Sequence, residues 1–426
     1  MTKILTVLAR GLEGAGVEKN SIEFTNWVNS KYSYKYQAAM VANSDIKWGR
    51  GNAHKHNSII LSFTKQMDEL KTLVDEYDIL LFMCTPLKKS SDEIKDSFVE
   101  ILDYANSKGK TTCYFQFDHK IRSLSTNMYS DPKYFNIFEK FDIVFNHSHN
   151  NDFAIKYIQK NGIKCKKMIC RGDYNIDNLF AIDFDKTKAV WKDYDAKLPR
   201  SIKFIGRSSG WKGPWKFRDL HFNHFMKDGY ISSAEGIELS IGTLVELYKT
   251  TKSPKIVRDD VTLDYIAATK ANVANINAGN ITLERNKPIY FMPPYDHDAA
   301  MERLSANMFG IELLMMSDEF MTDTIENAMF EIVATGCIPI FRKRWAECFT
   351  LNGKPLTAYG DRAGTIFLDE EHPEEALKKM NNIADDKELY DAMRNRAYKF
   401  YKSFFDVTPV YERLIDIILK EKDENK

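Results

Sequence analysis

Short apolar runs separated by segments of helix length recur along the whole chain, and they limit its fold more than any other feature of the sequence. Strand-sized runs that alternate with amphipathic segments are typical of βαβ units, whose strands pair in a parallel sheet. In the first half the runs are Ile4–Leu8, Ile79–Cys84, Thr112–Phe117, Ile143–Phe145 and Met168–Cys170. In the second half they are Ile202–Ile205, Ile289–Met292, Ile338–Phe341 and Ile366–Leu368. The pattern predicts an α/β fold with two Rossmann-like, doubly wound domains.

The boundary between these domains is predicted near residue 190. The stretch Asp173–Pro199 mixes charged and aromatic residues without a clean period, and it ends in a proline directly before a strong strand. We therefore place a linker at residues 185–200, a first domain at 1–190 and a second at 191–426. Apolar residues at helical spacing in 387–419, interrupted near Pro409, predict two terminal helices that pack back on the first domain.

The composition predicts a soluble protein of the cytoplasm. With 44% hydrophobic and 13% aromatic residues, a chain of 426 residues can build a substantial core in each domain. No run approaches the roughly eighteen apolar residues of a membrane span, and the first residues lead straight into a strand-like segment. Neither a signal peptide nor a membrane partner is expected.

The six cysteines are scattered, and several lie inside apolar runs. A reduced thiol in such a run behaves as a small hydrophobic side chain, so no disulfide framework is predicted. Cys165 and Cys170 have the wrong interval for a zinc knuckle and lack a nearby histidine, which favours a structural role. No metal is predicted.

Charge is balanced overall but uneven locally. Sixty Lys and Arg residues match sixty Asp and Glu residues, so net charge gives no argument for a polyanionic partner. The stretch Ala154–Arg171 is basic and contains no acid, and Arg200–Arg218 is again basic, with aromatic residues interleaved. Such stretches suit a phosphate backbone. The alternative is a solvated face balanced by acids elsewhere in space.

A glycine-rich turn, Arg10–Lys19, follows the first predicted strand and precedes a predicted helix. Glycines let the backbone approach a ligand, and a helix N-terminus offers free amide groups to anionic oxygen atoms. Gly14, Ala15 and Gly16 are therefore candidates for ligand binding. The segment is not the dinucleotide-binding GxGxxG pattern, so a plain structural turn is the alternative.

A second loop, Phe204–Gly213, follows the first strand of the second domain and carries Arg207 and Lys212. A guanidinium grips two oxygen atoms and an ammonium adds a mobile point charge, so the pair suits a diphosphate. Neutralising a departing nucleoside diphosphate is the main task of a glycosyltransferase that lacks a metal. A structural pair of surface cations is the alternative.

Acidic residues stand at both ends of the predicted helical segment Glu326–Glu331, which leads through Gly336 into the strand Ile338–Phe341. Carboxylates near the start of a helix can accept hydrogen bonds from sugar and ribose hydroxyls. Glu326 and Glu331 are therefore candidates for binding a sugar nucleotide. Ordinary helix acids are common, which is the alternative.

Polar residues follow two strands of the first domain. Phe117, Asp118 and His119 come at the carboxyl end of a strand, the edge where doubly wound sheets bind ligands. Asp118 can orient or deprotonate an acceptor hydroxyl, or stabilise positive charge on a sugar ring, and a helix N-cap is the alternative. His147 and His149 follow the next strand and can line the same cleft, without an acid at the spacing of a metal site.

These segments together resemble the DNA α-glucosyltransferase family of T-even phages, in the same order and at similar spacing. The similar blocks are Ala9–Val17, Gln116–His119, Phe141–Phe153, Ile205–Gly213 and Glu326–Phe341. The resemblance implies a GT-B architecture, in which two Rossmann-like domains face across a cleft and the second holds UDP-glucose. It also implies a retaining transfer to hydroxymethylated cytosine in double-stranded DNA, inside the infected bacterial host and alongside phage replication proteins.

The resemblance also implies roles for single residues. Arg207 and Lys212 would bind the diphosphate, Glu331 the ribose and Glu326 the donor sugar. Gly14, Ala15 and Gly16 would lie against the phosphates or the sugar, while Glu23 and Asp118 would approach the reacting groups. With Arg207, these two acids are the candidate catalytic residues. The candidate acceptor or sugar pocket comprises Phe117, His119, His147 and His149.

The chain departs from the family at positions expected near the sugar or the acceptor. Phe117 stands where the family has a histidine, and the helix from Glu326 reads Glu-Asn-Ala-Met-Phe-Glu instead of Glu-Tyr-Thr-His-Leu-Glu. Transfer of a pentose, as from UDP-arabinose, is therefore an alternative to glucose. Two further alternatives are a glycosyltransferase for envelope sugars or small molecules, and a non-catalytic module that binds nucleotide sugars or DNA.

Overall fold

The structure is a computed structural model, and it describes residues 1–11, 16–46, 57–116, 127–146, 162, 164–170, 181–205, 213–235, 290–291, 297–315 and 326–424. The chain divides into two compact units. The first comprises Met1–Asp183 and Phe404–Lys426, and the second comprises Phe184–Met321 and Ile325–Ser403. The second unit thus begins at Phe184, whereas the sequence places it at residue 191.

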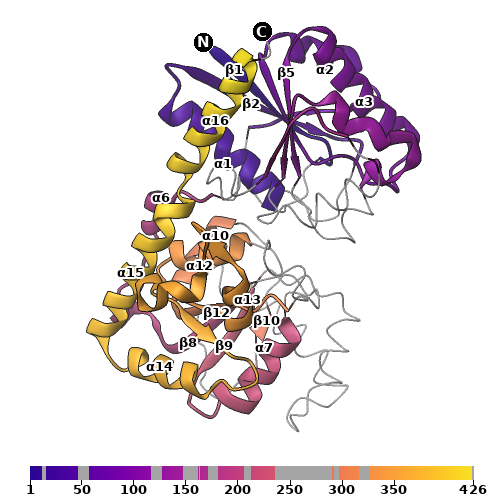
Figure 1. Cartoon of the computed structure of the whole chain (residues 1–426). Helices are drawn as coiled ribbons and strands as arrows, with labels where there is room; N and C mark the ends of the chain where they lie inside the picture. The colour runs from indigo at the N-terminus through magenta and orange to yellow at the C-terminus, as the bar shows by residue number, and fades with distance from the viewer. Residues whose placement is uncertain are drawn as a thin grey trace. The chain divides into compact units, whose positions relative to one another are not determined.

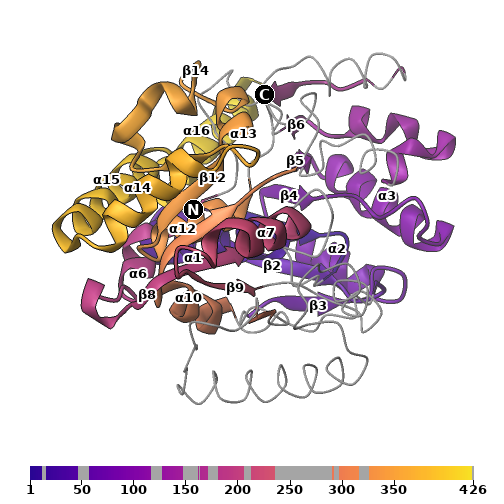
Figure 2. The ribbon, with the colours of Figure 1, turned by 90° about the horizontal axis from the view of Figure 1, so that it is seen from below.

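The first unit is built on a parallel sheet of seven strands in the order β3-β2-β1-β4-β5-β6-β7. The strands are β1 (Thr2–Leu8), β2 (Tyr36–Asn43), β3 (Ile59–Leu61), β4 (Ile79–Met83), β5 (Thr111–Gln116), β6 (Ile143–Asn146) and β7 (Met168–Cys170). Figure 2 shows the labelled strands β3, β2, β4, β5 and β6 following one another in this order. The strand order reverses at β1, so the switch point of this doubly wound sheet lies between β1 and β4.

Helices cover both faces of this sheet (Figure 1). One face packs against α2 (Met67–Asp75) and α3 (Asp92–Ser107) and the short helices η1 (Met128–Ser130) and η2 (Pro132–Lys140). The other lies against α1 (Gly16–Lys31) and the terminal α16 (Val407–Glu424). Phe24 of α1 packs edge-on against Tyr411 of α16, with ring centroids 5.2 Å apart. The indole N–H of Trp27 donates to the Thr408 hydroxyl at 3.2 Å, so the end of the chain completes the first unit.

The second unit is built on a parallel sheet of six strands in the order β10-β9-β8-β11-β12-β15. Its strands are β8 (Leu198–Ile205), β9 (Ile231–Glu235), β10 (Tyr290–Phe291), β11 (Asn307–Glu312), β12 (Ile338–Arg342) and β15 (Ile366–Leu368). A separate antiparallel pair is formed by β13 (Thr350–Leu351) and β14 (Lys354–Pro355). Here the order reverses at β8, so the switch point lies between β8 and β11.

The helices of the second unit form one large core with the sheet. Apolar side chains of α7 (Pro214–Leu220), η5 (His221–Phe225), α14 (Glu374–Ala384) and α15 (Lys387–Phe405) pack against β8, β11, β12 and β15. Contacts with β11 are also made by α10 (His297–Ser305) and α12 (Asn327–Ala334). The remaining helices are α6 (Phe184–Lys188), η3 (Tyr194–Ala196), α13 (Lys343–Cys348) and η6 (Leu356–Ala363).

The α/β class and the two doubly wound sheets confirm the sequence-based prediction of the fold. The two terminal helices, α15 and α16, meet at Asp406 rather than at Pro409. Within the described part of the chain, no helix is both long and apolar enough to cross a membrane. Free thiols are found at Cys84, Cys113, Cys165, Cys337 and Cys348.

A buried histidine makes the stability of the second unit dependent on pH. His221 is fully buried, with Nδ1 at 2.8 Å from the Ser232 hydroxyl, and burial lowers its pKa to about 4. Since an unfolded histidine titrates near 6.5, the unfolded state binds the extra proton between these two values. We expect stability to fall as pH drops from about 6.5 to 4, by up to about 1.4 kcal/mol per pH unit. Urea unfolding across this range should show a shallower pH dependence in His221→Gln, and an unchanged slope would contradict the assignment.

Candidate active site

The switch point of the second sheet is the natural place for a ligand in this unit, because two neighbouring strands send their loops in opposite directions there. The segment that leaves β8 at this point contains Arg207 and Lys212, both of which lie outside the described residues. Its flanks are described: β8 ends at Ile205, and Gly213 precedes α7. The fold therefore starts the predicted diphosphate-binding loop at the ligand-binding edge of the sheet.

Gly213 is the first described residue after this segment. It has a φ of +78°, and its carbonyl accepts the Phe217 N–H at 2.9 Å in the first turn of α7. A Cβ at this position would lie 2.8 Å from Met315 Cγ and 3.0 Å from Leu313 Cβ. Only glycine satisfies both the left-handed backbone and this close approach. Lys212 is thus covalently joined to a point packed against the segment that follows β11.

The acidic helix of the sequence analysis is α12, which connects the neighbouring parallel strands β11 and β12. A connecting helix runs back along such strands, so its N-terminus lies at their carboxyl edge. Glu326 is the N-cap residue, and its side chain makes no capping hydrogen bond. Glu331 is only 8% exposed and lies more than one turn further along the helix. Glu326 is therefore placed at the ligand-binding edge, and Glu331 lies deeper along the same helix with a small part of its surface exposed.

An ion pair that sequence reasoning missed lies at the same edge. Arg342, the last residue of β12, bonds Glu370, which follows β15, at 2.5 Å. Next to it, Asp369 accepts backbone N–H groups of Glu371 and His372, and the first of these bonds holds the pKa of Asp369 below its usual value. No local pattern could reveal the pair, because its members are 28 residues apart. The one feature of the sequence that could have indicated this pair is a basic residue, Arg342, at the end of a strongly apolar strand.

The switch point of the first sheet is organised by another residue that sequence reasoning had not singled out. Arg10 lies two residues beyond the end of β1, and its Nε donates to the Thr85 carbonyl, beyond the end of β4, at 2.9 Å. Its Nη2 donates to the side-chain oxygen of Asn127, a fully buried residue whose Nδ2 bonds the Tyr129 hydroxyl at 3.2 Å. Arg10 therefore ties the exits of β1 and β4 together where a ligand is expected.

The helix after the glycine-rich turn carries two predicted site residues. Gly16 is the first residue of α1, and Glu23 lies about 10 Å further along its axis, where it is half-buried. Burial, and then the charge of Glu23, raise the pKa of Tyr411 on α16. The Tyr411 hydroxyl contacts the Asn20 carbonyl of α1 at 3.5 Å. Glu23 thus lies near the α16 side of the helix.

The other predicted residues of the first unit lie outside the described residues. They are Gly14, Ala15, Phe117, Asp118, His119, His147 and His149. The strands before them are described, and β5 and β6 are neighbours that end at Gln116 and Asn146. Both segments therefore leave the same carboxyl edge of the sheet.

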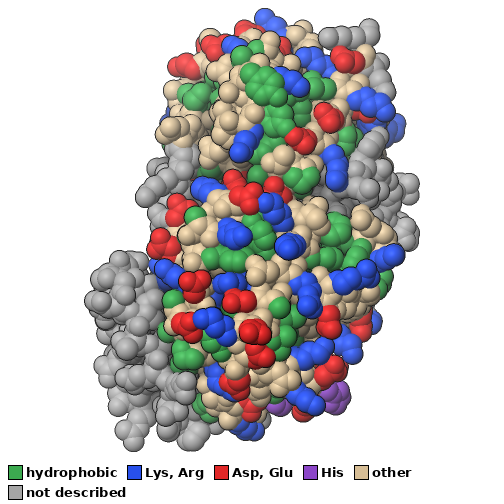
Figure 3. Space-filling view, turned by 90° about the vertical axis from the view of Figure 1, so that its left-hand side faces the viewer, with side chains coloured by type: hydrophobic (Ala, Val, Ile, Leu, Met, Phe, Trp, Pro, Cys, Tyr) green, Lys and Arg blue, Asp and Glu red, His purple; other side chains and the backbone are tan. Residues whose placement is uncertain are grey.

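The basic stretches are partly neutralised in space. Lys166 forms an ion pair with Asp142 at 2.9 Å, and Lys167 pairs with Glu421 of α16. In the second stretch, Lys216 pairs with Glu371 at 2.6 Å. On the face seen in Figure 3, the coloured residues also mix basic and acidic side chains. These three lysines are therefore neutralised by acidic residues and do not form a purely basic surface.

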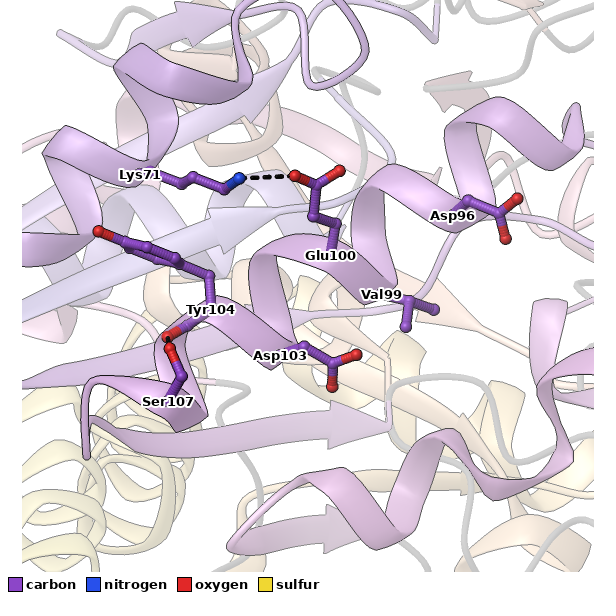
Figure 4. Close-up of a pocket in the computed structure, with 7 residues that line it drawn as sticks. All are labelled: Lys71, Asp96, Val99, Glu100, Asp103, Tyr104 and Ser107. Atoms are coloured by element: carbon purple, nitrogen blue, oxygen red, sulfur yellow. Dashed lines mark hydrogen bonds and ion pairs between the residues drawn. The ribbon is translucent and has the colours of Figure 1, made fainter.

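A hollow of about 540 Å³ in the first unit is lined by residues of α2 and α3. Three of its seven lining residues are acidic, and an ion pair of 2.6 Å between Lys71 and Glu100 spans part of it (Figure 4). None of the predicted site residues lines this hollow. We therefore assign the candidate active site to the switch points. Among the described residues, no group of three or more His, Cys, Asp or Glu side chains could hold a metal ion.

Two doubly wound parallel sheets in separate units, with the terminal helix returned to the first, define the GT-B class of glycosyltransferases. The model of the DNA alpha-glucosyltransferase family matches residues 15–388, and the chain belongs to this family. The DNA alpha-glucosyltransferase of Enterobacteria phage T4 is 25% identical over 427 residues, covering 98% of this chain and 100% of the relative. The protein is therefore a glycosyltransferase.

Solved structures agree with this fold. An alpha-glucosyltransferase in complex with UDP matches with a TM-score of 0.80 and 24% identity, covering 98% of this chain and 100% of the other. An alpha-glucosyltransferase in complex with UDP-glucose and DNA containing an abasic site matches with a TM-score of 0.79. The more distant HepE of Anabaena, in complex with UDP and glucose, matches with a TM-score of 0.56 at 12% identity over 98% of this chain and 99% of the other.

Proposed function

We propose that the protein transfers a sugar, glucose in the first instance, from a UDP-sugar to a hydroxylated cytosine in phage double-stranded DNA. The observation that carries this proposal is the switch point between β8 and β11. The loop with Arg207 and Lys212 leaves this point, and the helix that begins beside Glu326 starts at the same edge. Related solved proteins are described as complexes with UDP, or with UDP-glucose and DNA, which supports both substrates.

The residues of the second unit suit a donor with two phosphates. Arg207 can bind two phosphate oxygens at once, and Lys212 can follow the charge that grows as UDP departs. Stabilising that charge in the transition state lowers the barrier without a metal ion. We assign Glu331 to the ribose and Glu326 to the donor sugar, with Gly14, Ala15 and Gly16 against the phosphates or the sugar.

The reaction proposed is a front-side transfer with retention at the anomeric carbon. The acceptor oxygen attacks the face from which UDP departs, and a phosphate oxygen of the leaving group takes the acceptor proton. Asp118 and Glu23 are assigned to the reacting groups, and Phe117, His119, His147 and His149 to the sugar or acceptor pocket. Base flipping would bring a cytosine hydroxyl out of the duplex and into such a site.

The identity of the sugar is tested by supplying hydroxymethylcytosine DNA with separate UDP-sugars and weighing the digested nucleosides by mass spectrometry. UDP-glucose is expected to add one hexose to each modified cytosine. A pentose adduct from UDP-arabinose alone would correct the sugar and leave the reaction class intact. UDP binding without UDP release in the presence of acceptor DNA would instead favour a non-catalytic module.

The acceptor is tested separately by the dependence of binding on salt. Contacts with phosphates release counterions, so retention on DNA should fall steeply between about 50 and 200 mM salt. The expected location is the cytoplasm of the infected host, where such DNA is made. Transfer to envelope sugars or small molecules, with no salt-sensitive retention on DNA, would overturn the DNA assignment.

A further inference from the structure

A tight turn after β15 holds two neighbouring carboxylates toward different partners. The side chain of Asp369 accepts the backbone N–H groups of Glu371 at 3.1 Å and His372 at 3.3 Å. This turn leaves the Glu370 side chain only 8% exposed and the Glu371 side chain 72% exposed. One carboxylate therefore points into the protein and the other toward its surface.

The inward carboxylate holds the segment that leaves β11. Glu370 accepts from Nε and Nη2 of Arg342, each at 2.5 Å, and the arginine is only 14% exposed. The third nitrogen of the same guanidinium, Nη1, donates to the Leu314 carbonyl at 3.4 Å. Leu314 has a φ of +41°, a strained conformation for a branched side chain. The ion pair thus helps to hold a backbone turn that does not form easily by itself.

The turn at Leu314 packs against Gly213, the residue that follows the proposed diphosphate-binding loop. Leu313 and Met315, on either side of Leu314, are the residues that approach the Cα of Gly213 too closely for any other side chain. The outward carboxylate holds α7, the helix that follows Gly213, because Glu371 bonds Lys216 at 2.6 Å. This second contact is mostly exposed, so it contributes less than the buried pair.

We propose that Arg342 and Glu370 are positioning residues that hold Gly213 and the start of α7 in place, and thereby support the affinity for the donor diphosphate. The inference rests on the proposed function of the loop before Gly213. A shift of about 1 Å in a binding group can cost up to a hundredfold in rate. Loosening the contacts that hold Gly213 should therefore weaken the binding of UDP through the neighbouring Lys212 and Arg207.

The test compares Arg342→Met, the neutral pair Arg342→Met/Glu370→Gln and the control Arg200→Met. Arg342→Met leaves a buried carboxylate without its cation, so it should lower both the melting temperature and the affinity for UDP, the latter about tenfold. The double variant removes the lone charge and should recover much of the melting temperature. Its UDP affinity should stay low, because the Leu314 carbonyl still lacks its donor.

The control breaks a more exposed ion pair near the start of β8, where Arg200 bonds Asp385 at 2.5 Å. Arg200→Met should lose stability without losing UDP affinity. Calorimetric titration of UDP, with the KM values for donor and DNA, separates these cases, since only the donor KM should rise. A double variant that regains wild-type UDP affinity together with its stability would reduce the pair to a structural role. If the wild type does not bind UDP, the proposed function and the positioning role both fall.

Discussion

Replacing Arg207 with alanine is expected to lower turnover by about a hundredfold to a thousandfold, the usual cost of removing a donor that stabilises transition-state charge. The segment that carries Arg207 leaves the second sheet at its switch point. This is the place proposed for the diphosphate of the donor. The measurement is release of UDP from UDP-glucose with hydroxymethylcytosine DNA at saturating donor, so that weaker binding is not mistaken for slower chemistry.

The matched control for this substitution is Arg362→Ala, which removes an exposed arginine on η6 in the same unit. Its turnover should equal that of the wild type. A further variant, Arg207→Lys, keeps the charge but loses the planar pair of donors, and it should recover only part of the rate. Near-normal turnover of Arg207→Ala would contradict the assignment of the loop to the diphosphate.

The strands that were predictable are those with continuous apolar runs. All nine runs chosen from the sequence correspond to strands, whereas β2, β3, β9, β11 and the short strands β13 and β14 were not anticipated. In β9 the runs are broken by Ser232 and Ser233, which are buried but polar. In β11, Gly310 interrupts the apolar residues, and β3 has only three residues. Periodicity reports side-chain polarity, so it misses strands whose burial depends on tertiary contacts.

The candidate site shows the same division. A loop that follows a strand can be placed at the carboxyl edge of a parallel sheet from the sequence alone, which is how Asp118 became a candidate site residue. Strand order decides which of these loops lie at a switch point, and that order is a tertiary property. The contacts of Arg10 with Thr85 and Asn127, and of Arg342 with Glu370, likewise join segments that are distant in the chain. Their partners could not be named before the structure.

The largest expected loss of stability in the second unit is at Gly364, between η6 and β15. The residue has a φ of +58°, and a Cβ there would lie 2.3 Å from the Ala397 nitrogen and 2.7 Å from the Met393 carbonyl oxygen. Both atoms belong to the backbone of α15, which cannot move aside as a flexible side chain can. Gly364→Ala should therefore cost about 2–5 kcal/mol, the sum of left-handed strain and overpacking.

A second glycine of the same unit separates these two effects. Gly229 has a φ of +78°, but nothing lies within 4 Å of the position of its Cβ. Gly229→Ala should cost only the backbone strain, about 1–2 kcal/mol. Hydrogen exchange of the α15 amides measures the opening free energy of this unit without assuming two-state unfolding of the whole chain. Equal losses of stability in the two variants would show that the close contact between residue 364 and the α15 backbone adds nothing to the cost of the backbone strain.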